Sequence, residues 1–210
     1  MEGKISKKYR CILACVGIFF AAVGVAFNAK AGLGNDPIGV FYDGVRSALN
    51  MSGSQLGVAS NIINACLLLF VFVFGRKYIN IGTVIHFLLY GNFVTVGTYA
   101  YLSIFGNSDL LLYKIIASVI GCLLLYLGVA IFITVDIGID AMTGIVMTFK
   151  DKFGCEFKYV KWGFDIVLVV VGFVCGGKVG AITIATVIFA APLIQFFAQK
   201  VKKLCIMHKI

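Results

Sequence analysis

Six long apolar segments divide this 210-residue chain, and a helix needs roughly 20 such residues to cross a lipid bilayer. They cover residues 11–29, 56–74, 79–105, 110–135, 160–175 and 179–197, the fifth being the shortest. Hydrophobic residues make up 61% of the chain and charged residues 13%, whereas soluble domains average about 45–50% and about 25%. The sequence therefore predicts an all-α polytopic membrane protein, with six transmembrane helices forming a single membrane domain over residues 1–210.

The positions of the basic residues predict how these segments are oriented. All but four of the 18 lysines and arginines lie at the chain ends, or in or next to the connections that follow segments two and four. The exceptions are Lys30, Arg46, Lys114 and Lys178. Cytoplasmic loops carry an excess of Lys and Arg, so we expect both termini in the cytoplasm. The net charge of +9 is then explained by membrane topology, and we expect no nucleic-acid partner.

A glycine-aspartate segment occurs twice, as GLGNDPIG at residues 32–39 and as DIGIDAMTG at residues 136–144. Aligning the two copies also matches positions further along the chain. The matched pairs are Gly34 with Gly138, Asp36 with Asp140 and Asn61 with Asp165. Further on, residues 75–83 match residues 176–183 with one residue deleted, which pairs Thr83 with Thr183. Each half, about 11–105 and about 110–199, holds three apolar segments, so the second half must enter the membrane from the opposite face. We therefore predict two inverted three-helix repeats, a plan common among secondary transporters.

The Gly-Asp segments are candidates for the breaks that form a binding site in such repeats. Glycine permits sharp turns and close approach of the backbone. The candidate turn positions are Gly32, Gly34, Gly138, Gly82 and Gly180. Pro37 suits the first turn of a helix and Asp36 its N-cap, so a short helix is expected after each segment, either interfacial or re-entrant. Asp36 and Asp140 fit helix capping and a ligand site equally well.

Other polar residues fall inside the apolar segments, where a charge costs about 2.5–3.5 kcal/mol or more. His86 has the titration range for proton coupling, although a neutral histidine bonded to a neighbouring helix gives the same pattern. Asp165 is a candidate for a ligand or ion site, or for an interfacial cap or internal salt bridge. Asn61 and Asn64 give the second segment a polar face, and we expect Asn61 and Asp165 to meet near the axis that relates the repeats.

Sequence motifs for enzymes are absent from the chain: it has no His-Glu-x-x-His, Gly-x-Ser-x-Gly or Walker motif. Most of the seven cysteines lie in or beside apolar segments, where a thiol behaves as a small hydrophobic group. We therefore expect no enzymatic activity, no metal site and no cofactor.

Three motifs together resemble the YczE/YyaS/YitT-like group of small bacterial integral membrane proteins. They are GLGNDP after the first apolar segment, a Gly-Thr turn opening the third, and GGKVGAIT before a last segment that contains proline. The resemblance covers about residues 12–198 and implies a bacterial inner-membrane protein, but it supplies no substrate and no catalytic residues. Asn35 departs from a small hydroxyl residue expected there, and Ala141 from an expected proline.

These observations favour a small secondary transporter or exporter of an unidentified small solute or ion, with the two halves giving alternating access. A second hypothesis is a substrate-binding membrane subunit of a larger importer, with Ala22 and Ala26 as its docking face, although the inverted repeat argues against it. A third is an accessory membrane protein without a transport role. Faces of small residues also leave a homodimer open.

Overall fold

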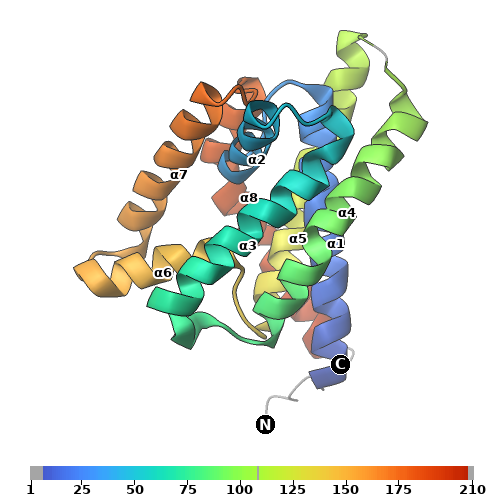
Figure 1. Cartoon of the computed structure of the whole chain (residues 1–210). Helices are drawn as coiled ribbons and strands as arrows, with labels where there is room; N and C mark the ends of the chain where they lie inside the picture. The colour runs from blue at the N-terminus through green and yellow to red at the C-terminus, as the bar shows by residue number, and fades with distance from the viewer. Residues whose placement is uncertain (1–6, 108, 208–210) are drawn as a thin grey trace.

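The computed structural model describes residues 7–107 and 109–207, and in these ranges all regular structure is helical (Figure 1). The helices are α1 (Lys7–Ala31), α2 (Pro37–Ala48), α3 (Leu56–Phe74), α4 (Ile81–Phe105), α5 (Leu111–Val135), α6 (Ala141–Phe153), α7 (Phe157–Val174) and α8 (Ala181–Met207). Single 3-10 turns at Gly53–Gln55 and Arg76–Tyr78 precede and follow α3. The short helices α2 and α6 follow the two Gly-Asp segments as expected. Lys4 and Lys209, two of the terminal basic residues, lie outside the described ranges.

Four helices, α1, α3, α4 and α5, are long and apolar enough to cross a membrane. α8 adds a fifth if its two parts form one span, because it bends by 51° between Ala190 and Pro192. Proline produces such a bend because it lacks an amide hydrogen and its ring crowds the preceding turn. α7 is short and holds two lysines and an aspartate among its 18 residues. The prediction of a helical membrane protein is therefore confirmed, with four or five candidate spans instead of the six expected.

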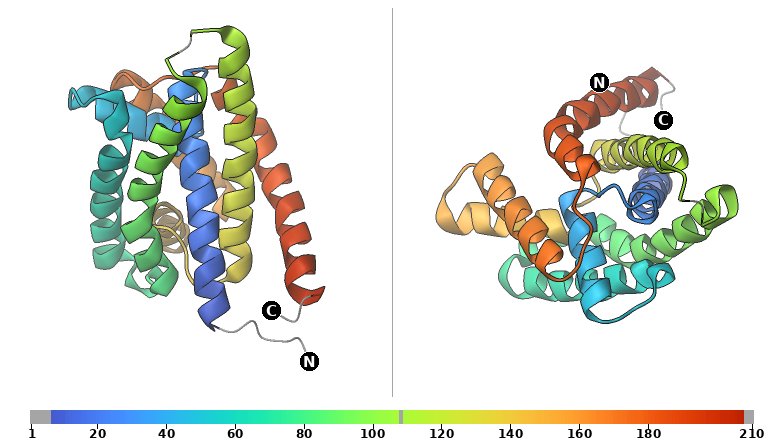
Figure 2. Two further views of the ribbon diagram at one scale, coloured as in Figure 1. Left: turned by 90° about the vertical axis from the view of Figure 1, so that its right-hand side faces the viewer. Right: turned by 90° about the horizontal axis from the view of Figure 1, so that it is seen from above.

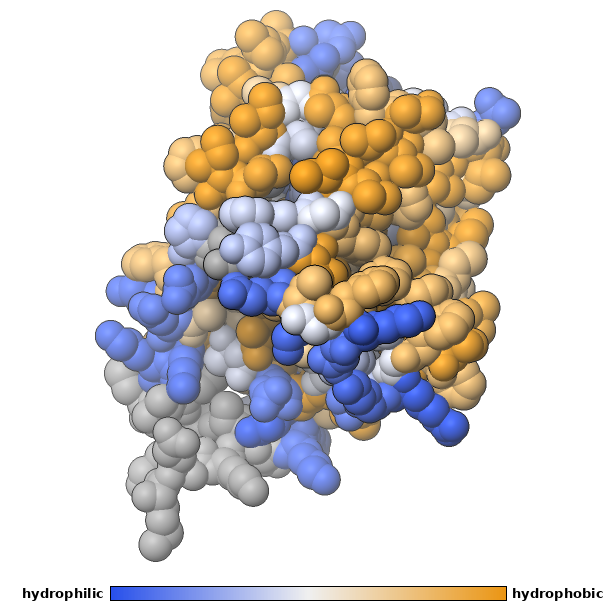
Figure 3. Space-filling model, turned by 90° about the vertical axis from the view of Figure 1, so that its left-hand side faces the viewer, coloured by the Kyte–Doolittle hydropathy of each residue, from blue (hydrophilic) through white to orange (hydrophobic). Residues whose placement is uncertain are grey.

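The outward faces of these helices are strongly apolar. Val174 is 79% exposed, Val73 68% and Leu69 66%, on three different turns of the surface. On the face in Figure 3, hydrophobic side chains cover most of the upper part, and hydrophilic side chains gather on the lower part. A soluble protein rarely exposes apolar patches of this extent. The exposed surface thus indicates a membrane location.

α1 lies at the centre of the bundle, between α4 and α5 (Figure 2), and its most extensive contact is with α5. Glycines allow the two antiparallel backbones to touch. A Cβ on Gly24 would lie 2.5 Å from the carbonyl oxygen of Gly121, and one on Gly17 would lie 2.8 Å from that of Gly128. We call these four residues the glycine seam. Close approach of this kind is how membrane helices gain packing energy without a hydrophobic driving force.

The two short helices pack on helices far from them in sequence. α2 lies against α7, where a Cβ on Gly44 would be 2.3 Å from the Gly172 carbonyl oxygen. α6 lies against α3, with Gly144 facing the side chain of Val71. Each short helix therefore covers a helix of the other half of the chain, and the halves interlock.

We expect Gly24→Ala to lower the free energy of unfolding by about 1–3 kcal/mol, because the added methyl group has no space against α5. Gly163→Ala in α7 is the matched control, since nothing lies within 4 Å of a Cβ at that position. The measurement is thermal or denaturant unfolding of both variants in one detergent. Equal effects of the two substitutions would contradict the close contact at the glycine seam.

Candidate functional site

The two Gly-Asp segments leave α1 and α5 as non-helical chain and cross to the start of a distant helix. The Leu33 carbonyl accepts a hydrogen bond from the backbone amide of Ile182 in α8 at 3.0 Å. The Ile137 carbonyl accepts one from the backbone amide of Gly82 in α4, also at 3.0 Å. We call these contacts the two crossings. Each break is completed by the first turn of a helix far away in sequence.

Glycine is required on both sides of the crossings. Three of the glycines predicted to form turns have positive φ, namely Gly32 (+73°), Gly34 (+107°) and Gly138 (+145°). Residues with a side chain rarely adopt this region. A Cβ on Gly180 would lie 2.3 Å from the Leu33 carbonyl oxygen, and one on Gly82 would lie 3.0 Å from that of Ile137. The other two predicted glycines therefore permit close approach instead of a turn.

A threonine at each helix start ties the crossing to the helix. The Thr183 hydroxyl accepts a hydrogen bond from the Asn35 amide at 3.2 Å, and the Thr83 hydroxyl donates one to the Ile139 carbonyl at 2.5 Å. Both hydroxyls also accept from the backbone amide three residues earlier, at 3.3 Å. The buried side chain of Asn35 donates to the Val25 carbonyl of α1 at 3.0 Å. These bonds fix where the first Gly-Asp segment lies.

The two aspartates differ in their partners. Asp140 caps α6, because its carboxylate accepts hydrogen bonds from the Thr143 amide at 3.0 Å and from the Thr143 hydroxyl at 2.7 Å. Asp36 occupies the N-cap position of α2 but forms no side-chain capping bond. Its Oδ1 is buried without a hydrogen-bond partner among the described residues. Capping thus explains Asp140 and leaves Asp36 without a structural role of that kind.

A buried polar and aromatic group lies inside the bundle. The Tyr42 hydroxyl of α2 donates to Asn64 Oδ1 of α3 at 3.0 Å, and both residues are only 2% exposed. The Tyr42 and Tyr90 rings are 6.0 Å apart, and His86 stacks on Tyr90 with ring centroids 4.7 Å apart. We call Tyr42, Asn64, His86 and Tyr90 the central cluster.

The central cluster connects the two Gly-Asp segments electrostatically. Asp36 and Asp140 are both close enough to act on the Tyr42 and Tyr90 hydroxyls, and Asp140 also acts on His86. The sequence predicted Asp36, Asp140, Asn64 and His86 as site residues, and the structure brings them to one region.

Asn61 and Asp165 do not meet as expected. Asn61 faces Gly91 of α4, where a Cβ would lie 2.1 Å from its Oδ1. Asp165 forms an ion pair with Lys161 one turn earlier in α7, and this pair acts electrostatically on Asp36. No hydrogen bond joins Asn61 to Asp165 in the described part of the chain. The two residues correspond in the alignment, but their side chains face different helices.

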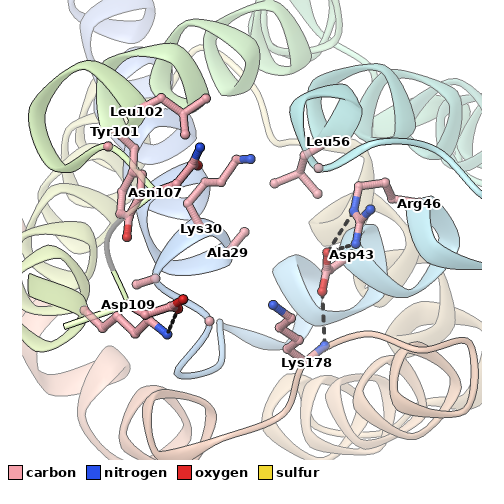
Figure 4. A pocket seen from close by; sticks show the side chains of 15 residues that line it. Ala29, Lys30, Asp43, Arg46, Leu56, Tyr101, Leu102, Asn107, Asp109 and Lys178 are labelled. Atoms are coloured by element: carbon pink, nitrogen blue, oxygen red, sulfur yellow. Dashed lines mark hydrogen bonds and ion pairs between the residues drawn. The ribbon is translucent and has the colours of Figure 1, made fainter. Parts of the chain in front are cut away.

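A cavity of about 370 Å³ opens at the end of the bundle where α1 stops (Figure 4). Its charged lining residues are Lys30, Asp43, Arg46, Asp109, Lys114 and Lys178. We call this space the basic cavity. Its lining includes all four basic residues that are exceptions to the charge bias, Lys30, Arg46, Lys114 and Lys178.

Two carboxylates neutralise part of the charge in the basic cavity. Asp43 pairs with Arg46 at 2.9 Å and also accepts a hydrogen bond from the Lys178 backbone amide at 3.1 Å. Lys114 donates to Asp109 at 2.8 Å, and this hydrogen bond lowers the pKa of Asp109. Asp43 therefore links α2 to the loop before α8, at the rim of the cavity.

A second, smaller hollow of about 260 Å³ lies at the other Gly-Asp segment. Its lining consists of residues 136–139 with Tyr78 and Asn80. In the alignment of the two halves, Asp136 corresponds to Gly32, which lines the basic cavity. The two ends of the protein thus carry hollows at equivalent places, and the first is larger and more basic.

The described residues include no group of three His, Cys, Asp or Glu side chains placed to hold a metal. The site instead offers hydrogen-bonding groups, a buried carboxylate and a basic mouth. Such groups bind and orient a polar or charged solute.

A family model described as a family of unknown function, DUF6198, matches residues 8–199. The chain belongs to this family. It is 25% identical to an uncharacterised protein of Haemophilus influenzae over 87% of this chain and 80% of the relative. It is also 25% identical to the uncharacterised membrane protein YczE of Bacillus subtilis, over 86% of this chain and 81% of the relative. No solved structure matches the chain.

The family assignment confirms the resemblance to YczE-like proteins. The DUF6198 match includes both Gly-Asp segments, both crossings and the central cluster, so the whole candidate site lies within the sequence that defines the family.

Sequence reasoning missed several residues of the site. No sequence pattern singled out Tyr42, Tyr90 was recognised only as a residue on the same helical face as His86, and Asn35 only as a departure from a family pattern. Lys30 and Lys178 had a usable signal, because they are exceptions to the charge bias. Their convergence in one cavity depends on the tertiary structure.

We expect Asp140→Ala to lower the free energy of unfolding by about 1 kcal/mol through loss of the cap on α6. Asp36→Ala removes no capping bond and should leave stability unchanged or raise it, because the buried Oδ1 of Asp36 has no hydrogen-bond partner among the described residues. Thermal unfolding of the two variants beside the parent measures the difference. A similar loss in both would show that Asp36 is also a structural cap.

Proposed function

We propose that this protein is a small secondary transporter built from two inverted repeats, about residues 11–105 and 110–199. The observation that carries the proposal is the reciprocal pair of crossings, Leu33 to Ile182 and Ile137 to Gly82. Leu33 aligns with Ile137, and Gly82 aligns with Ile182. Equivalent residues thus make equivalent bonds at the two ends of the bundle, as a twofold axis in the membrane plane requires.

The glycine seam supports the same relation. Gly17 and Gly24 align with Gly121 and Gly128 at the offset that relates Leu33 to Ile137. Gly17 contacts Gly128 and Gly24 contacts Gly121, so each glycine meets the equivalent of the other. A pair of helices related by a twofold axis makes contacts of this kind. We infer that the halves pivot about α1 and α5.

The central cluster and Asp36 form the proposed solute path. It lies between the two crossings, where broken helices place free backbone groups in inverted-repeat transporters. Asp36 contributes a carboxylate without a capping bond, while His86 stacks within the cluster near Asp140. In this proposal the path opens alternately to the two hollows at the ends of the bundle, of which the basic cavity has the larger volume.

We further propose that the protein lies in a bacterial cytoplasmic membrane with both termini in the cytoplasm, as the distribution of Lys and Arg favours. The basic cavity, with Lys30 and Lys178, then faces outward. The turn with Arg76 and Lys77 and the end of α8 with Lys203 then face inward, where positive charge is favoured.

The importer-subunit alternative loses the docking surface that the sequence offered. Ala22 and Ala26 are completely buried within the chain, and Ala26 lies against Gly97 of α4. This face is therefore unavailable to a partner protein or to a second copy of the chain.

The proposal predicts that the purified chain alone moves a solute across a bilayer. Liposomes containing the protein are loaded with a defined metabolite mixture, and mass spectrometry measures which compounds leave relative to protein-free liposomes. Asp36→Asn should abolish or strongly slow the release while the protein remains folded. A solute that binds but never crosses would favour the importer-subunit role, and no solute at all would contradict transport.

Cross-linking tests the rocking motion itself. The seven native cysteines are first replaced, and Leu33→Cys and Ile182→Cys are then introduced together. A short, reducible bis-thiosulfonate reagent links the two new cysteines. We expect release to stop on cross-linking and to recover on reduction, because the crossing joins the two halves. Each single cysteine variant treated with the same reagent is the control. Undiminished release from the cross-linked protein would rule out rocking at this crossing.

A further inference from the structure

The basic cavity gathers an unusual set of charges for the outer side of a membrane protein. The bias of Lys and Arg toward the cytoplasm leaves only four basic residues on this side, and all four line one space. They come from four separate places in the chain, at the end of α1, in α2, at the start of α5 and before α8. Chance scatter over the outer surface does not produce such a concentration.

Two of these cations are matched by carboxylates and two are not. Asp43 holds Arg46, and Asp109 holds Lys114. The side-chain ammonium groups of Lys30 and Lys178 have no hydrogen-bond or ion-pair partner among the described residues. The lining therefore carries two positive charges in excess.

Both unmatched ammonium groups belong to residues that line the basic cavity. The half-buried Lys30 ammonium is repelled by Arg46 and Lys178 and attracted by Asp43. A glycine beside each lysine leaves room for its side chain. A Cβ on Gly53 would lie 3.1 Å from Lys30 Nζ, and one on Gly32 would lie 3.5 Å from Lys178 Nζ. Figure 4 shows both side chains at the cavity, on either side of its open centre.

The available donors select the kind of anion. The guanidinium of Arg46 is occupied by Asp43 and by the Met51 carbonyl at 2.7 Å, so it offers no open fork for a planar carboxylate. The free donors are compact ammonium charges, which suit the several oxygens of a phosphate group. A volume of about 370 Å³ admits a phosphate with a small organic substituent.

We infer that the basic cavity is a binding site for a phosphate group, held by Lys30 and Lys178. The group belongs either to a soluble phosphate or phosphate monoester or to the headgroup of a phospholipid in the outer leaflet. Binding at this mouth does not depend on transport, and it holds whether or not the chain moves a solute.

The test measures thermal unfolding of the full chain in phospholipid-free detergent against increasing inorganic phosphate, with chloride at matched ionic strength as the reference. Phosphate should raise the midpoint as expected for a ligand that binds only the folded state. Lys30→Gln and Lys178→Gln should each weaken the apparent affinity by roughly tenfold. They should also raise the midpoint without phosphate, because each removes like-charge repulsion. This second readout separates loss of binding from poor folding.

Two controls complete the design. Lys203→Gln removes an exposed lysine at the far end of α8 and should respond to phosphate like the parent. Lys178→Arg keeps the charge and should retain most of the response. The inference is overturned if phosphate acts no differently from chloride, or if the glutamine variants and the parent respond alike.

A comparison with and without phospholipid shows whether the bound phosphate group belongs to a lipid or to a soluble compound. The parent and the Lys30→Gln/Lys178→Gln double variant are compared in nanodiscs of phosphatidylglycerol and in phospholipid-free detergent, with glycerol 3-phosphate as the soluble monoester. If a lipid headgroup is the occupant, phosphatidylglycerol stabilises the parent more than the double variant and removes its response to glycerol 3-phosphate. If the occupant is soluble, that response persists in both environments.

Discussion

A peptide group inside a membrane protein has no water to bond with, so each carbonyl and amide freed by a helix break needs a partner within the protein. The two crossings meet this requirement. The carbonyls of Leu33 and Ile137, left without helical partners, pair with amides in the first turns of α8 and α4, which are themselves unsatisfied at a helix start. One hydrogen bond thus satisfies two groups at each end, and the glycines around it follow from the short distance between the chains.

The rest of the arrangement depends on these bonds. Because α1 must end at one crossing and α5 at the other, the two helices lie antiparallel along the glycine seam, with α4 and α8 on their outer sides. The short helices are then directed across the bundle onto α7 and α3. The central cluster lies where α2, α3 and α4 converge, and the basic cavity forms beside the first crossing, with Gly32 in its lining.

Much of this fold was predictable from local patterns, because apolar length and turn residues determine helices directly. The apolar segment 56–74 coincides with α3, and the short helix expected after the first Gly-Asp segment begins at Pro37, where the sequence placed its first turn. The repeat shows which residues occupy equivalent positions in the two halves, but equivalent residues need not touch. Asn61 faces α4 and Asp165 pairs within α7, so the two are not in contact. Nor could matching aspartates reveal different roles. Three positions after each aspartate the residues differ, because Thr143 adds a hydroxyl bond to Asp140 whereas Gly39 has no side chain to offer Asp36.

Because the halves interlock, the contacts between them can form only in a certain order while the chain is being synthesised. α1 and its Gly-Asp segment are made early, yet the partner of Leu33 is Ile182, which the ribosome adds near the end of the 210 residues. The second crossing closes earlier, because Gly82 precedes Ile137 and both are present once α5 is made. The end of the bundle with the second crossing is therefore able to assemble while the end with the first crossing still lacks α8. Until then the Leu33 carbonyl of the first Gly-Asp segment lacks the backbone amide with which it pairs in the finished protein.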